Sequence, residues 1–188
     1  MKEVVLERPK GKVWTYEDYL SGRIPAEVSE VVKGKEVRKM PAGDIHGFME
    51  ALITGLLIKS KGPYIVLSGE VALLLSRSPL TLRGADVVAI SGDRWKLKGG
   101  AIEVPPDLIV EIVSPSDSLP YILEKIEDYR RWGVKRQVWV FPEDRKVMVV
   151  DEGGVKVFSE KDEVKLLEDV KFRLKDLLKE VGDEGSSS

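Results

Sequence analysis

The stretch from Arg83 to Val140 places charged residues inside runs that otherwise suit buried strands. Its successive segments read RGADVVAI, PDLIVEIVSPSD, YILEKIEDYRRWGV and KRQVWV. Short continuous apolar runs are typical of buried strands, and the longer amphipathic run before KRQVWV is typical of a helix. Yet Asp86 begins the run that continues VVAI, and Glu111 interrupts LIVEIV.

Two carboxylates at one sheet edge call for a positive partner. A carboxylate buried without one costs several kcal/mol or takes up a proton, and two neighbouring carboxylates also repel each other. A divalent cation between them removes this conflict, so the pattern favours a metal site. The chain has no cysteine and one histidine, which excludes thiolate and multi-histidine sites. Oxygen ligands then favour magnesium, manganese or calcium.

Length and composition limit the class of protein. The 188 residues suit one domain, expected over 1–182, with a disordered tail at 183–188. Apolar runs stay well short of the roughly 20 residues that cross a membrane, and the first residues do not resemble a signal peptide. We therefore expect a cytoplasmic protein. The net charge of −2 argues against non-specific coating of nucleic acid but leaves a local basic patch open.

Changes of period divide the chain into helices, strands and turns. Helical spacing of apolar residues predicts one helix over 44–59 and another over 119–132, which Gly133 ends. Lys33-Gly34 marks a hairpin turn, and SRSPLTLRG (76–84) is interpreted as a connection between strands. The strands of the central sheet are expected near 71–75, 83–90, 107–113 and 136–141.

The order of these elements predicts an α/β fold. A strand, helix and strand through 107–141 imply a parallel pair with a right-handed crossover. The other elements fit a mixed central sheet flanked by helices, with additional hairpins at the N- and C-terminal ends. A site at the strand ends would then lie beside the helices.

The same segments resemble a known family. RGADVVAI, PDLIVEIVSPSD and EKIEDYRRWGVKRQVWVF are similar to the Uma-two family, restriction-endonuclease-like proteins of the PD-(D/E)XK nuclease superfamily. SEVVKGKEV resembles the family's hairpin, and the resemblance runs from about Tyr16 to Val150. It implies a restriction endonuclease-like fold and a metal-dependent nuclease that hydrolyses phosphodiester bonds with Mg²⁺ or Mn²⁺. Nucleic acid is the implied substrate, DNA before RNA.

The resemblance also implies roles for individual residues. Asp86 and Glu111 match the two acidic metal ligands, and the backbone carbonyl of Ile112 would add a third oxygen. The usual lysine two residues after the glutamate is absent, and Lys125 in the following helix takes its place, assisting the attacking water.

Two further positions match the edge of the same site, and one departs from the family pattern. Glu30 and His46 are the matching residues and are expected to act with the catalytic group. Ala85 stands where a proline normally precedes the aspartate, which removes no ligand.

Other interpretations of these residues stay open. Lys125 could be a solvated helix residue paired with Glu124 and Asp128, His46 a surface residue, and Glu30 the exposed side of a hairpin. The chain could be a catalytically inactive nuclease-fold module that acts by binding. It could also be an unrelated α/β domain in which a buried lysine or arginine pairs with Glu111.

A homodimer is a further expectation from the exposed hairpins of such a domain. Trp95, Trp132 or the edge strands near 146–158 would supply its contact surface.

Overall fold

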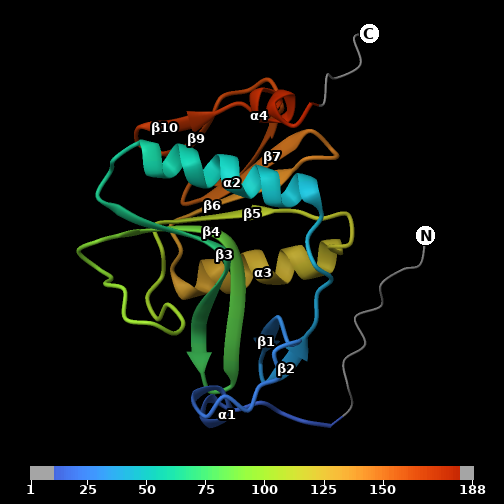
Figure 1. Ribbon diagram of the computed structural model, residues 1–188, viewed down its shortest axis with the longest axis vertical. Coiled ribbons are helices and arrows are strands. Elements are labelled where there is room, and N and C mark those ends of the chain that lie inside the picture. The colour runs from blue at the N-terminus through green and yellow to red at the C-terminus, as the bar shows by residue number, and fades with distance from the viewer. Residues whose placement is uncertain (1–10, 183–188) are drawn as a thin grey trace.

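A mixed sheet forms the centre of the molecule in the computed structural model, which describes residues 11–182 (Figure 1). The tail predicted to be disordered, 183–188, lies outside these residues. Within them, eight strands form the large sheet: β1 (Glu30–Val32), β2 (Lys35–Val37), β3 (Tyr64–Arg77), β4 (Leu80–Ser91), β5 (Leu108–Ile112), β6 (Arg136–Phe141), β7 (Lys146–Asp151) and β8 (Gly154–Ser159).

The order of the strands is β2-β1-β4-β5-β6-β7-β8, and β3 pairs with β4 outside this path. The parallel pair predicted through 107–141 is confirmed, because β5 and β6 are parallel and α3 (Leu119–Trp132) connects them. The neighbouring pairs β1–β4, β4–β5, β6–β7 and β7–β8 are antiparallel. The predicted α/β class with a mixed central sheet is therefore confirmed.

Helices cover the two faces of this sheet (Figure 1). The helix α2 (Asp44–Lys59) buries Met49, Ile53 and Leu57 on one face, in a core that also contains Val110. On the other face, α3 packs Ile122 and Tyr129 into a core with Ile109. Adjacent residues of β5 thus contact opposite cores, as the alternation of side chains along a strand requires.

Smaller elements close the two ends of the molecule. The short helix α1 (Tyr16–Leu20) lies near β1 and β2, and the Thr15 side chain caps it with Asp18 in a capping box. At the opposite end, β9 (Val164–Leu167), β10 (Val170–Phe172) and α4 (Leu174–Glu180) contribute to the same core as α2. No helix within 11–182 is long and apolar enough to cross a membrane.

The segment 76–84 is not a connection between strands, as the sequence suggested, but the tight turn of a long hairpin with the end of β3 and the beginning of β4. The strand β3 runs unbroken to Arg77, and β4 already begins at Leu80. Leu80 and Leu82 are buried beside Trp14, so apolar contacts fix this strand. Arg83, expected at the start of a strand near 83–90, lies inside β4 and is only 1% exposed.

Candidate functional site

A buried lysine joins two carboxylates between the sheet and α3. Lys125 Nζ lies 3.0 Å from Glu111 Oε2 and 3.2 Å from Glu30 Oε1. Lys125 shares the buried face of α3 with Ile122 and Tyr129, which stand three and four residues away on the helix. Glu111 belongs to β5 and Glu30 to β1, so three separate elements meet at this cation.

Glu30 is held as a carboxylate by several donors. Arg83 Nη1 donates to Glu30 Oε2 at 2.8 Å, the Tyr121 hydroxyl donates to the same oxygen at 2.9 Å, and the Gly84 N–H donates to Oε1 at 3.1 Å. Burial alone would raise the pKa of Glu30, but the charges of Lys125 and Arg83 outweigh it and lower this pKa to about 2.

Arg83 also reaches α3. Its Nη2 lies 2.6 Å from Asp128 Oδ2 and 3.6 Å from Glu124 Oε2. These are the two carboxylates that the solvated interpretation of Lys125 assigned to that lysine. That interpretation is wrong, because Lys125 is 1% exposed and its partners are Glu30 and Glu111.

Among the buried carboxylates around Lys125, Glu111 is the one whose ionised form is disfavoured. The Tyr129 hydroxyl donates to its Oε1 at 2.6 Å, and Lys125 contacts both of its oxygens. Burial and then the nearby charge of Asp86 raise the pKa of Glu111 to about 8, although Lys125 opposes the rise. The pKa of Lys125 is itself raised well above its ordinary value, because Glu111 and Glu30 outweigh the cost of burying its charge.

Asp86 lies beside Glu111 on the neighbouring strand. Val87 pairs with Val110 in the antiparallel register of β4 and β5, and continuing that register sets Asp86 opposite Glu111. The Ile112 N–H donates to Asp86 Oδ2 at 2.7 Å. Burial would raise the pKa of Asp86, but hydrogen bonds and charge from His46, with this N–H, lower it.

A bulge in β3 faces Asp86. Ser68 pairs with Val87 and Val71 pairs with Ala85, so two residues of β3, Gly69 and Glu70, stand opposite the single Asp86. Gly69 adopts a φ of +92°, which favours glycine. Bulges of this kind redirect side chains beside functional sites.

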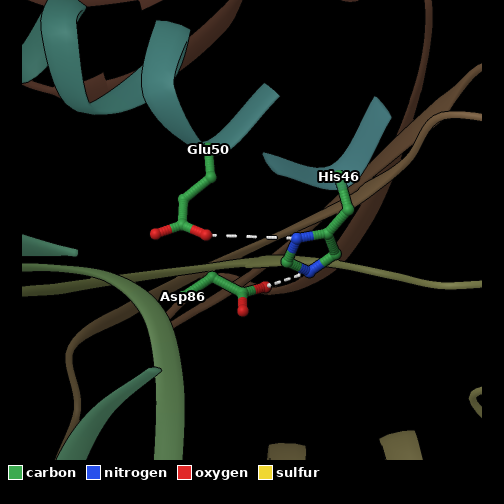
Figure 2. Close-up of side chains that lie close together, drawn as sticks. All are labelled: His46, Glu50 and Asp86. Carbon is green, nitrogen blue, oxygen red and sulfur yellow. Dashed lines mark ion pairs between the residues drawn. The ribbon is translucent and has the colours of Figure 1, made fainter. Parts of the chain in front are cut away.

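His46 lies between two carboxylates (Figure 2). Its Nε2 is 3.2 Å from Asp86 Oδ2, and its Nδ1 is 4.0 Å from Glu50 Oε2. One ligand atom from each of the three residues lies within 4.8 Å of the others, which is compatible with a shared ion. His46 Nδ1 is buried and has no hydrogen-bond partner within 11–182.

Both carboxylates act on the ionisation of the imidazole. Burial is the largest influence on His46 and acts downward, but the hydrogen bond to Asp86 and the charges of Asp86 and Glu50 raise its pKa. Burial and the charge of Asp86 likewise raise the pKa of Glu50. A cation beside these groups would relieve this crowding of negative charge.

The structure brings the residues that the sequence singled out into one region. His46, with 11% of its side chain exposed, is not a surface residue, and Glu30 does not lie on the exposed side of its hairpin. Glu111 pairs with a buried lysine, Lys125. The interpretation of the chain as an unrelated α/β domain required such a pair, but in the structure Asp86 also lies beside Glu111.

Sequence reasoning missed several residues of this region. Glu50 follows His46 by four positions on α2, and Tyr129 follows Lys125 by four on α3, so helical spacing from a candidate residue was the available signal. Tyr121 precedes Lys125 by four positions on α3 and gave the same signal. Arg83 gave no such signal, since only the folded chain brings it to Glu30.

A pocket opens beside these residues, and His46 and Tyr121 form part of its wall. The segment after β2 contributes Arg38 and Lys39, and Lys39 Nζ lies 5.5 Å above the ring of Tyr121. The loop before α3 contributes further polar groups, Ser114, Ser116, Asp117 and Ser118. The rim of this pocket therefore mixes basic and acidic side chains, because Glu70 and Asp117 also line it and Lys39 Nζ lies 3.9 Å from Glu70 Oε1.

Comparison with known proteins finds a matching family and a similar solved structure. The family model Uma2, described as "Putative restriction endonuclease", matches residues 16–175. The chain is also similar to a solved structure from Anabaena variabilis described as "a putative nuclease belonging to DUF820", with a TM-score of 0.75 and 17% sequence identity over 88% of this chain and 97% of that chain. This likeness establishes a shared fold. No curated protein matches the chain.

Proposed function

The chain belongs to the Uma2 family, and from that premise we propose that it is a metal-dependent nuclease that hydrolyses phosphodiester bonds. One observation carries the proposal. Asp86 and Glu111 lie side by side on β4 and β5, and Lys125 bonds to Glu111 from α3. Two buried carboxylates with an adjacent lysine are the groups that a metal-assisted hydrolysis needs.

The residues present fit a divalent cation. Carboxylate oxygens of Asp86 and Glu111, with the carbonyl of Ile112, would form the hard donor set that Mg²⁺ or Mn²⁺ prefers. The raised pKa of Glu111 and its like-charged neighbour Asp86 supply a reason for a cation to bind. When bound, the ion supplies Lewis-acid polarisation of the phosphoryl group and lowers the pKa of a coordinated water.

The protein's own side chains orient this centre. Lys125 holds Glu111 in place and keeps its proton, because two carboxylates raise its pKa. In this state it orients the attacking water and offsets negative charge that develops on the phosphoryl oxygens. Glu30 holds Lys125, Arg83 in turn holds Glu30, and His46 borders the pocket from which substrate would enter.

The rim of the pocket suits a nucleic acid backbone. Arg38 and Lys39 line the pocket together with serines of the loop before α3, although Glu70 and Asp117 line it as well. Phosphates are bound by such basic side chains without regard to base sequence. We take DNA as the first substrate to test and RNA as the second.

An inactive binding module is the second candidate function. It is favoured by the burial of Lys125, which is engaged by two carboxylates, and by the net charge of −2. In that case the buried network would hold the fold and the pocket would bind without turnover.

A nuclease assay separates these two functions. Labelled single- and double-stranded DNA and RNA are incubated with Mn²⁺ and with the wild type, Asp86→Asn, Glu111→Gln or Lys125→Ala. We expect wild-type cleavage, its loss in both carboxylate variants, and a fall of roughly 10²–10⁴ in Lys125→Ala. Glu168→Gln, at a side chain 88% exposed, should cleave normally. Absence of cleavage by wild type on all four substrates would favour the binding module.

We also propose a homodimer formed through β8. This strand lies at the edge of the sheet, and Val155 and Val157 on it are 61% and 65% exposed. Trp95, an earlier candidate for this contact, is buried and is excluded. Light scattering at high micromolar concentration should give twice the chain mass, and Val157→Glu should give a monomer; a monomeric wild type contradicts the proposal.

A further inference from the structure

We propose that His46 binds the cation directly through Nε2 and that Glu50 is a positioning residue that fixes the orientation of its ring. The proposal rests on the proposed metal site at Asp86 and extends it by one nitrogen donor and one supporting carboxylate. It goes beyond the pair Asp86 and Glu111, whose oxygens alone would not distinguish magnesium from manganese.

The spacing of His46 and Asp86 suits two ligands of one ion. Nε2 lies 3.2 Å from Asp86 Oδ2. Two adjacent ligands, each about 2.1 Å from an octahedral ion, lie roughly 3 Å apart. An ion could therefore replace the contact between these two atoms with little movement of either side chain.

The other nitrogen of the ring gives Glu50 its role. His46 Nδ1 is buried and lacks a hydrogen-bond partner within 11–182, and Glu50 Oε2 lies 4.0 Å away on the same side of the ring (Figure 2). A histidine that binds a metal usually donates its second N–H to a carboxylate, which fixes the tautomer and the ring orientation. With Nε2 on the ion, the proton must be on Nδ1, facing Glu50.

The fold holds this pair in place. His46 and Glu50 are one helical turn apart on α2, and Met49 and Ile53 of the same helix are fully buried against the sheet. Asp86 approaches from β4 below them. Because an imidazole nitrogen favours transition metals over magnesium, the three residues should make the site prefer Mn²⁺ to Mg²⁺.

The single histidine allows a direct test. Pulsed electron paramagnetic resonance detects a ¹⁴N nucleus bound to Mn²⁺, and in an untagged chain an imidazole signal can come only from His46. The full chain loaded with one equivalent of Mn²⁺ should give this ¹⁴N modulation, and His46→Gln should lose it. Bound Mn²⁺ without imidazole modulation in the wild type overturns the inference and leaves the proposed nuclease site intact. Failure of the wild type to bind Mn²⁺ overturns both.

Two substitutions of Glu50 test its positioning role. The Gln oxygen of Glu50→Gln can still accept from Nδ1–H, so Mn²⁺ affinity should stay within a few-fold of wild type. Glu50→Leu removes the acceptor and should weaken Mn²⁺ binding by roughly 10–100-fold, the range for a lost supporting contact. Glu168→Gln serves as the control for charge, and circular dichroism checks folding. If Glu50→Gln loses as much affinity as Glu50→Leu, Glu50 is itself a ligand and the positioning role is wrong.

Discussion

Individual charges at the centre of this molecule are compensated by one another rather than by water. Arg83 and Lys125 are each 1% exposed, and together they contact carboxylates from β1, β5 and α3. Removing one member of a buried ion pair costs about 3–5 kcal/mol, because its partner is left without compensation. Glu30 contacts both cations and is therefore the residue on which the network depends most.

Glu30→Gln should flatten the acid dependence of stability in the metal-free protein. The pKa of Glu30 is lowered to about 2 in the folded state from an ordinary 4.5, so its ionised form favours folding above pH 4.5. This contribution, about 3 kcal/mol from the difference in pKa, is lost as the pH falls from 4.5 towards 2.

Urea unfolding at pH 6 and pH 3 measures this contribution. Wild type and the control Glu168→Gln should lose about 2 kcal/mol more between the two pH values than Glu30→Gln does, because pH 3 is still above the folded pKa of about 2 and part of the contribution remains. Glu30→Gln should also be less stable at pH 6, where Arg83 and Lys125 lose a charged partner. An equal pH dependence in all three proteins would show that Glu30 is not the group responsible.

At the scale of elements, local signals in the sequence predicted most of the structure. Helix α2 has the predicted bounds 44–59, and α3 the predicted bounds 119–132 with Gly133 as its left-handed cap, because apolar spacing and capping residues act within a few positions. Strands near 71–75 and 83–90 were predicted, but the extension of β3 and β4 through 76–84 was missed, because Leu80 and Leu82 are fixed there by contact with Trp14, far away in the chain. The candidate site residues were predicted from the family resemblance and from charged residues inside apolar runs. The contacts of Lys125 and the position of Glu50 could be seen only in the folded structure.

Two glycines in or beside helices should respond oppositely to alanine. Gly55 lies exposed inside α2, and nothing lies within 4 Å of an added Cβ, so Gly55→Ala should raise the free energy of unfolding by about 0.5–1 kcal/mol. Gly133 ends α3 with a φ of +104°, and an added Cβ would also lie 3.4 Å from Pro105 Cγ. Gly133→Ala should lower the free energy of unfolding by about 1 kcal/mol or more. Chemical denaturation measures both, and a loss of stability in Gly55→Ala would contradict this account of α2.

At the scale of the whole molecule, the site joins elements that are distant in sequence. The residues His46, Asp86, Glu111 and Lys125 come from α2, β4, β5 and α3, so both helical layers and the sheet between them meet at one place. A ligand bound there would be bound only by the folded chain. Its binding must therefore stabilise the entire fold by mass action.

Manganese should raise the melting temperature of wild type but not of Glu111→Gln. At a concentration 100 times the dissociation constant, binding adds about 2.7 kcal/mol to the free energy of unfolding. Without metal, Glu111→Gln should be about as stable as wild type, because Lys125 keeps Glu30 and the repulsion from Asp86 is relieved. Melting scans with and without Mn²⁺ measure this, and an unchanged shift in Glu111→Gln would place the ion elsewhere.

The location of a bound ion tests the central claim most directly. A crystal of the wild type soaked in Mn²⁺ is measured at a wavelength where manganese scatters anomalously. We predict one strong anomalous peak within bonding distance, about 2.2 Å, of carboxylate oxygens of both Asp86 and Glu111. A peak bound to only one of these residues, a peak elsewhere in the molecule, or none at saturating Mn²⁺ would contradict the proposed metal centre.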